Sequence, residues 1–245
     1  MNFLRDQSFL ILGLGDSGLA MVIGKPNESR LIKAVHAAGG PSAQINASLQ
    51  LAASLAPQDF AVMLENARFL PAHASQAIFI QSVLRRWTEH DPAAAAKWCQ
   101  GNASKQLGEV VRLWAAQDLR GATAFIATLP QDARIKAVAG CSEALAATDP
   151  AAALAFIARR AAPESQYELR EAFRLMAVKD PQWLLTQGET LPASLRTAAR
   201  EAAAQEMAAK DLAGAAAWAA GEPDGPGLLR SVFSRAGDPA EALAV

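Results

Sequence analysis

The sequence predicts an all-α fold, an α-solenoid of tandem antiparallel helix pairs with about six repeats. Two observations carry this prediction: a residue suited to a helix N-cap recurs about every 31 positions, and two apolar-periodic stretches follow it. Fixed-period similarity of this length is typical of stacked supersecondary units. The recurring residues have spacings of 32, 32, 27, 31, 31, 31 and 27, and they are Asn27, Asp59, Asp91, Asp118, Asp149, Asp180, Asp211 and Asp238.

The first stretch of each repeat is predicted to be a helix that begins at this cap. An Asp side chain accepts from the free amides of the first turn, and a following Pro lacks the donor that would be unused there. Proline follows the cap at Pro92, Pro150, Pro181 and Pro239. A large ring stands seven residues after the cap as Trp98, Phe125, Phe156 and Trp218. Since seven residues make about two turns, the rings should share one face.

A break is predicted about twelve residues after the cap. The breakers are Pro71, Pro130, Pro192 and Pro223, with Gly39, Gly40 and Pro41, or Gly101 and Asn102, in other repeats. Apolar residues spaced by three and four then predict a second helix. Examples are Leu107, Val110 and Trp114; Leu169, Phe173 and Met176; and Ala77, Ile80, Leu84 and Trp87. Four positions before the next cap stands an anchor expected to pack beneath the following repeat, namely Leu55, Trp87, Trp114, Leu145, Met176 or Met207.

Two further features suit a stacked array. The spacings of 27 are four residues short of 31, which is about one helical turn, so the buried face stays in phase. Alanine runs at 93–96, 151–153 and 215–217 fall in the first helices. Small side chains allow helices to approach closely, and alanine is also the best helix former.

The chain is therefore divided into an apolar N-terminal segment, residues 1–26, and a repeat domain, residues 27–245. Within the first segment, residues 9–23 (FLILGLGDSGLAMVI) are the most apolar stretch. A solenoid needs its exposed apolar end covered, so one interpretation is an irregular cap on the first repeat. Two other interpretations remain open.

One alternative is nucleotide binding, because Gly13, Gly15 and Gly18 form a G-x-G-x-x-G pattern after a strand-like run. That motif brings backbone amides and a helix N-terminus to a pyrophosphate within a βαβ unit. The residues that follow predict helices and no further strand, so the context of the motif is missing.

The other alternative is an envelope-tethered scaffold in which residues 9–23 act as a signal or membrane anchor. The stretch is shorter than the roughly 20 residues needed to span the hydrocarbon, and a central Asp16 would cost about 3 kcal/mol there. Arg5 is followed at once by Asp6, which cancels the positive charge expected of a signal. A cytoplasmic location is favoured over a membrane-tethered or exported one.

Catalytic, cofactor and metal sites are not predicted. His36, His73 and His90 lie in different repeats, and Cys99 and Cys141 have neither disulfide nor metal spacing. We interpret both cysteines as buried small apolar residues. The cap aspartates already have a structural role and lie a full repeat apart, so we do not assign them to acid–base chemistry.

The charge pattern excludes one class of partner. The formal net charge is −1 and basic residues are interspersed with acids, so the sequence lacks a stripe that could neutralise a run of phosphates, and we expect no nucleic-acid partner. Arginines recur in the second helices as Arg85, Arg86, Arg112 and Arg174. They form either a solvated helix face or a ridge for an acidic partner.

The tandem pattern of Asp-Pro cap, Ala-rich turn, aromatic ring, Leu-Pro break and Trp or Met anchor resembles bacterial helical-repeat proteins and is broadly similar to tetratricopeptide and HEAT superhelices. The resemblance covers residues 27–245. The period of 31 differs from the tetratricopeptide period of about 34, and the Leu-Gly and Tyr signature is missing. The resemblance implies a non-enzymatic scaffold that binds a protein or peptide partner, with no binding residues carried over.

Overall fold

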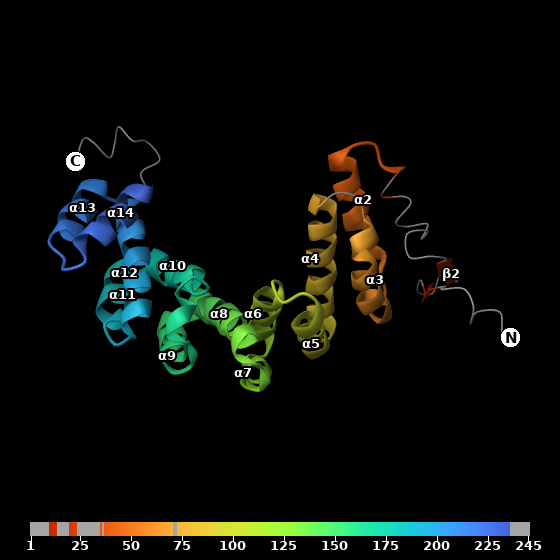
Figure 1. The fold of residues 1–245 in the computed structure, drawn as a ribbon, viewed down its shortest axis with the longest axis horizontal. Coiled ribbons are helices and arrows are strands. Elements are labelled where there is room, and N and C mark those ends of the chain that lie inside the picture. Colours follow the sequence, from red (N-terminus) through yellow and green to blue (C-terminus); the bar gives the residue numbers. More distant parts are fainter. Residues whose placement is uncertain (1–9, 14–19, 24–34, 36, 71–72, 236–245) are drawn as a thin grey trace. The chain divides into compact units, whose positions relative to one another are not determined.

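The computed structural model describes residues 10–13, 20–23, 35, 37–70 and 73–235. Apart from one pair of short strands, their regular elements are helices, and within each compact unit neighbouring helices pack against one another, which confirms the prediction of an all-α fold at this level. The chain forms two compact units, Met1–Gln106 and Leu107–Val245 (Figure 1). The predicted boundary between residues 26 and 27 lies outside the described residues and stays a prediction.

The strands in the first unit are β1 (Leu10–Gly13) and β2 (Ala20–Ile23). They pair antiparallel, with Leu10 opposite Ile23 and Gly13 opposite Ala20. A dinucleotide-binding turn would instead lead from the first strand into a helix and then into a parallel strand. Gly15 and Gly18 lie outside the described residues, and the pairing of β1 with β2 does not provide the βαβ context that the nucleotide alternative requires.

The helices of the first unit are α2 (Pro41–Ser54), α3 (Phe60–Asn66), α4 (His73–His90) and α5 (Pro92–Asn102). Short 3₁₀ turns, Pro57–Asp59 and Ala67–Phe69, precede and follow α3. The longest of these helices, α4, packs against α2, α3 and α5. The predicted break before α2 is confirmed, because Gly40 takes a φ of 94° that favours glycine.

In the second unit, first and second helices alternate along the chain as predicted. The first helices are α7 (Leu119–Thr128), α9 (Pro150–Arg160), α11 (Pro181–Gly188) and α13 (Leu212–Ala220). The second helices are α6 (Leu107–Gln117), α8 (Gln131–Thr148), α10 (Arg170–Lys179), α12 (Ala193–Ala208) and α14 (Gly225–Arg235). Each second helix packs against the next, so α6, α8, α10, α12 and α14 form a continuous row (Figure 1).

Five of the predicted caps join one helix to the next. Each Asp carboxylate accepts from the amide three residues on, at 2.9 to 3.0 Å. Its own amide donates to the anchor carbonyl four residues back, as from Asp118 to Trp114 at 2.7 Å. All five have similar, non-helical backbone angles, with φ between −156° and −134° and ψ between 84° and 100°. They are Asp91, Asp118, Asp149, Asp180 and Asp211, whereas Asn27 and Asp238 lie outside the described residues.

The predicted cap at Asp59 is wrong. Asp59 ends the 3₁₀ turn that Pro57 begins, and its φ of −94° and ψ of −9° are helical. Because its backbone is not extended, its carboxylate does not accept from the first turn of α3. The side chain is buried instead, and burial raises its pKa. Pro57 stands before this Asp, whereas Pro follows the Asp at three of the five confirmed caps.

Anchors and alanines supply the core as predicted. Leu55, Trp114 and Met176 are buried, while Trp87, Leu145 and Met207 are half-buried. Alanines of the first helices, such as Ala95, Ala153 and Ala215, are also buried. In α4 the expected stripe is partly wrong: Ala77 is exposed, and Phe79 and Val83 are buried with Leu84. Burying Phe79 and Val83 removes more apolar surface from water than burying Ala77 would, so the helix presents these larger side chains to the interior.

Glycines set the contact between α6 and α8. A Cβ atom added to Gly140 would lie 1.9 Å from the carbonyl oxygen of Gly108, and one added to Gly108 would lie 3.1 Å from the carbonyl oxygen of Lys136. Here the backbones of α6 and α8 are in contact, so a side chain added at either glycine could not be accommodated by rotating a neighbouring side chain. The sequence analysis did not single out either glycine.

Candidate interaction site

A groove lies on the row of second helices in the second unit. Its volume is about 670 Å³, and side chains of α10, α12 and α14 line it. The floor includes Ala198 and Ala202, whose small side chains leave the space open. The other lining residues are Gln166, Tyr167, Glu168, Arg170, Glu171, Arg174, Thr197, Glu201, Gln205, Arg230, Ser231 and Ser234.

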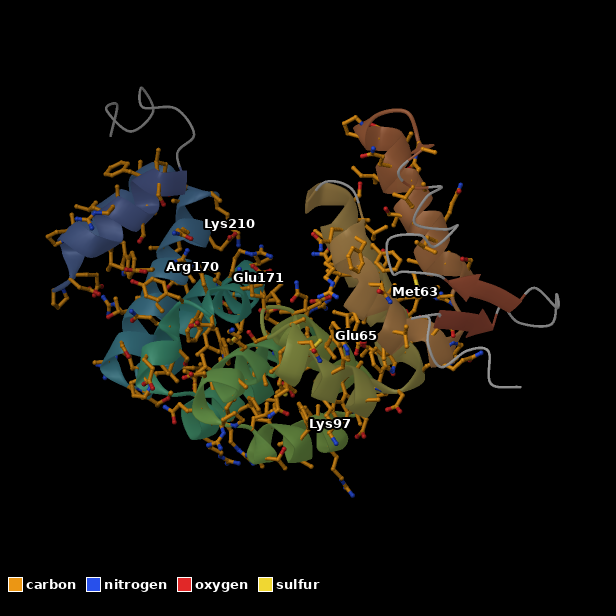
Figure 2. The ribbon with its side chains drawn as sticks, turned by 45° about the vertical axis from the view of Figure 1, so that its right-hand side comes forward. Met63, Glu65, Lys97, Arg170, Glu171 and Lys210 are labelled. Atoms are coloured by element: carbon orange, nitrogen blue, oxygen red, sulfur yellow. The ribbon has the colours of Figure 1, made fainter. Side chains whose placement is uncertain are left out.

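An exposed aromatic side chain marks one end of this groove. Tyr167, in the turn that precedes α10, is 70% exposed, although tyrosine is usually intermediate in burial in folded proteins. The guanidinium of Arg170 lies 5.8 Å from the centre of its ring. Figure 2 shows Arg170 beside Glu171 at the start of α10. An aromatic ring with a cation above it and an acid nearby suits contacts with both apolar and polar groups of a peptide.

Ion pairs hold two arginines of this row of helices in place, one of them in the groove. Arg174 donates through Nε and Nη2 to both carboxylate oxygens of Glu171, at 2.8 and 2.6 Å. Arg112 on α6 pairs with Glu109 in the same bidentate way. Bidentate pairs have more defined geometry than ordinary surface ion pairs. The groove therefore presents both signs of charge in fixed positions.

The other two arginines of the predicted row also have partners. Nε of Arg85 lies 3.7 Å from Oε1 of Glu89. Arg86 donates to the carbonyl oxygens of Ala52 and Leu55, and the bond to Leu55 is 3.0 Å long. These contacts favour a packing role for Arg86 and a solvated helix face for Arg85, and they argue against a ridge of unpaired arginines for an acidic partner.

A row of alternating charge continues from the groove toward α6. Arg112, Glu143, Arg174 and Gln205 stand 31 residues apart on α6, α8, α10 and α12. The side chain of Glu143 is 22% exposed, and its Oε2 atom lies 4.0 Å from Nε of Arg112. Burial, and then repulsion from Glu171, raises the pKa of Glu143 from 4.5 to about 7, although Arg112 opposes the rise. The charge beside the groove therefore changes near neutral pH.

The predicted structural role of both cysteines is confirmed. Cys99 in α5 and Cys141 in α8 are buried free thiols, and burial raises the pKa of each to about 12. Such thiols are protonated at neutral pH and are poor nucleophiles.

The histidines do not gather into a site in the described part of the chain. His90 is exposed at the end of α4, with its ring 6.4 Å from that of Phe60. The side chains of His36 and His73 lie outside the described part. Within residues 37–70 and 73–235, and in the shorter described segments, no three His, Cys, Asp or Glu side chains are arranged to hold a metal ion. Among the described helices, none has the length and apolar character required to cross a membrane.

Sequence reasoning missed the groove, although one signal pointed to it. Tyr167 is the only tyrosine of the chain, and it stands outside the ring position seven residues after the cap. The repeat pattern assigns Tyr167 no packing role. The remaining lining residues are common surface types with no distinctive spacing.

Comparison with family models, with curated protein sequences and with solved structures found no match to this chain.

Proposed function

We propose that this chain is a non-enzymatic α-solenoid scaffold that binds an extended segment of a protein partner in the groove of α10, α12 and α14. About six helix-pair repeats would form residues 27–245, in an array related in design to bacterial tetratricopeptide-like and HEAT-like proteins. Second helices that pack in sequence are the arrangement that such an array requires. Nucleic acid is not the proposed partner, because the net charge is −1.

The groove carries the proposal. A hollow of about 670 Å³ lies within the usual range for ligand sites. The 70% exposure of Tyr167 supplies an aromatic contact of the type enriched at interfaces. Since acids and arginines both line the groove, a peptide with mixed polar and apolar side chains fits it better than a uniformly charged one.

Site-specific photo-crosslinking tests this proposal. A photoreactive phenylalanine analogue would replace Tyr167 in the groove or, as the matched control, Val178. Val178 lies on α10, the helix that follows Tyr167, is 46% exposed, and does not line the groove. Both full-length proteins would be crosslinked in soluble and detergent-solubilised lysate of the source organism. We expect a specific protein adduct at position 167 only. Adducts identical at both positions, or none at 167, would reject the groove.

A further inference from the structure

A second surface of the same unit surrounds the C-terminal turn of α9. Two hollows lie there, one of about 320 Å³ and one of about 130 Å³. Arg159 and Arg160, in the last turn of α9, line both of them. Neither arginine lines the groove described above. The two hollows thus share a basic wall and form one surface of the molecule.

The larger hollow is apolar because a repeated ring pair is incomplete. In two repeats the anchor and the following ring are both aromatic. The ring centroids of Trp87 and Trp98 lie 6.3 Å apart, and those of Trp114 and Phe125 lie 5.5 Å apart. The corresponding pair in the next repeat is Leu145 and Phe156, and both line the larger hollow. Since leucine is smaller than tryptophan, it leaves space beside the ring of Phe156.

A third apolar side chain extends this space toward solvent. Leu119, the first residue of α7, is 41% exposed and lines the same hollow as Leu145 and Phe156. Exposed apolar surface that borders charged groups is typical of interaction sites. The opening is therefore suited to an apolar side chain of a partner.

The smaller hollow is basic. Arg134 lines it together with Arg159 and Arg160, and hydrogen bonds of 3.2 and 2.6 Å to the carbonyl oxygen of Leu129 hold the Arg134 guanidinium in place. Among the described residues no acid forms an ion pair with Arg159 or Arg160, unlike Arg112, Arg174 and Arg200. The C-terminus of α9 carries about half a negative charge. Together with the carboxylate of Glu164, which accepts from Gln131 at this hollow, it does not balance three cations.

We propose that this surface binds an acidic segment of a partner protein in which a large apolar residue stands next to Asp or Glu. The apolar side chain enters the hollow beside Phe156, and the carboxylate pairs with Arg159 and Arg160. Because the two hollows share these arginines, the apolar and acidic residues must be close neighbours in the partner. Arginine binds carboxylates with defined geometry, and the apolar hollow limits the partner to acidic segments that also carry a large apolar residue. This surface is additional to the groove.

Fluorescence anisotropy with full-length protein tests the proposal. The probe is a labelled peptide with blocked termini and the sequence Gly-Ser-Leu-Asp-Phe-Asp-Glu-Gly. One control peptide carries Asn and Gln in place of the acids, and another carries Ser in place of Leu and Phe. We expect saturable binding of the probe that weakens as salt increases, because charge attraction is screened. Both control peptides should bind more weakly.

Two variants separate the basic wall from the apolar hollow. The double substitution Arg159→Gln and Arg160→Gln should weaken binding about tenfold or more, since it removes charge-assisted hydrogen bonds. Leu145→Trp restores the ring pair found in the earlier repeats, so it should fill the hollow and weaken binding while preserving the fold. Arg85→Gln, an exposed arginine of α4 that lines neither this surface nor the groove, is the matched control and should bind the probe normally. Circular dichroism would verify that each variant is folded.

Several results would overturn the proposal. These are no saturable binding at low salt, equal binding of the amide peptide, or unchanged binding by the folded double variant. Tighter binding of RNA or of phosphatidylserine vesicles, with the same dependence on Arg159 and Arg160, would assign the surface to a different partner. The crosslinking experiment at Tyr167 does not involve these residues, so failure of one site would leave the other testable.

Discussion

The contact between α6 and α8 and the contact between α10 and α12 both join second helices of neighbouring repeats, but the first is closed and the second borders an open groove. In the first, backbone meets backbone at Gly108 and Gly140 and the contact is closed. In the second, side chains line an open groove. The positions 31 and 62 residues after Gly140 are Glu171 and Ala202, and both line this groove. The absence of a side chain at position 140 therefore permits the close approach of α8 to α6, whereas the corresponding residues of α10 and α12 line accessible space.

Substituting Gly140 should break the closed contact and produce the largest effect. In Gly140→Ala the new Cβ would lie 1.9 Å from the carbonyl oxygen of Gly108, and 2.7 Å from its carbonyl carbon. Because backbone atoms cannot rotate away, α6 and α8 must separate. We expect the free energy of unfolding to fall by about 3 kcal/mol or more, measured by urea denaturation.

Gly101→Ala is the matched control, since Gly101 is also helical and a Cβ there meets no atom within 4 Å. It should stabilise the protein by up to about 1 kcal/mol, because alanine favours helix over glycine. If the two variants unfolded at the same urea concentration, the close approach of α6 to α8 would not be a feature of the protein in solution.

Removal of Trp114 tests the packed end of α6. This side chain is 7% exposed and its ring lies 5.5 Å from that of Phe125. Trp114→Ala should lower the free energy of unfolding by about 3 kcal/mol through lost burial and a residual cavity. Tyr167→Ala, in the open groove, should change it by less than about 0.5 kcal/mol. Equal losses in thermal melts would mean that Tyr167 also has a packing role.

Sequence predicted those features that depend on local chemistry. The Asp caps, the alanines of the first helices and the anchors follow from helix capping and from spacings of three and four residues. Asp59 shows the limit of that approach. It stands at the cap position of its repeat, but its φ and ψ are helical because it belongs to the 3₁₀ turn that begins at Pro57. The groove and the contact at Gly140 depend on which residues meet across two helices, which one repeat pattern does not specify. Only Tyr167 gave a sequence signal for the site.

The caps that connect the closed and open regions have a smaller expected effect. Asp149 accepts from the amide of Ala152 at 3.0 Å, so Asp149→Ala should lower the free energy of unfolding by about 1 kcal/mol. Asp59→Asn is the contrasting change, because Asp59 is buried without this hydrogen bond. Burial raises the pKa of Asp59 in the folded state, so its charge destabilises the fold as pH rises, and Asn should be neutral or stabilising at pH 7. Thermal melts in which the two variants lose equal stability would mean that position 59 is a cap after all.

Glu143 on α8, between the closed and open regions, gives the smallest effect and a dependence on pH. Its pKa is raised from 4.5 to about 7 in the folded protein, so between these values the unfolded chain has lost the proton that the folded chain retains. Stability from this group is therefore fully present below about pH 4.5 and is lost as pH rises through 7. Partial exposure should limit the loss to below about 1 kcal/mol.

Glu143→Gln removes this titration. We expect the variant to exceed the parent in urea midpoint above pH 7 and to lose that advantage toward pH 4.5. The matched control is Glu164→Gln, because Glu164 is exposed and hydrogen-bonds only to the side chain of Gln131 at 2.8 Å among its described contacts. A parent protein whose stability does not fall between pH 5 and 8 relative to Glu143→Gln would show that water reaches this carboxylate. Water would then reach the contact of α8 with α10 as it reaches the groove, and the open region would extend from α14 to α8.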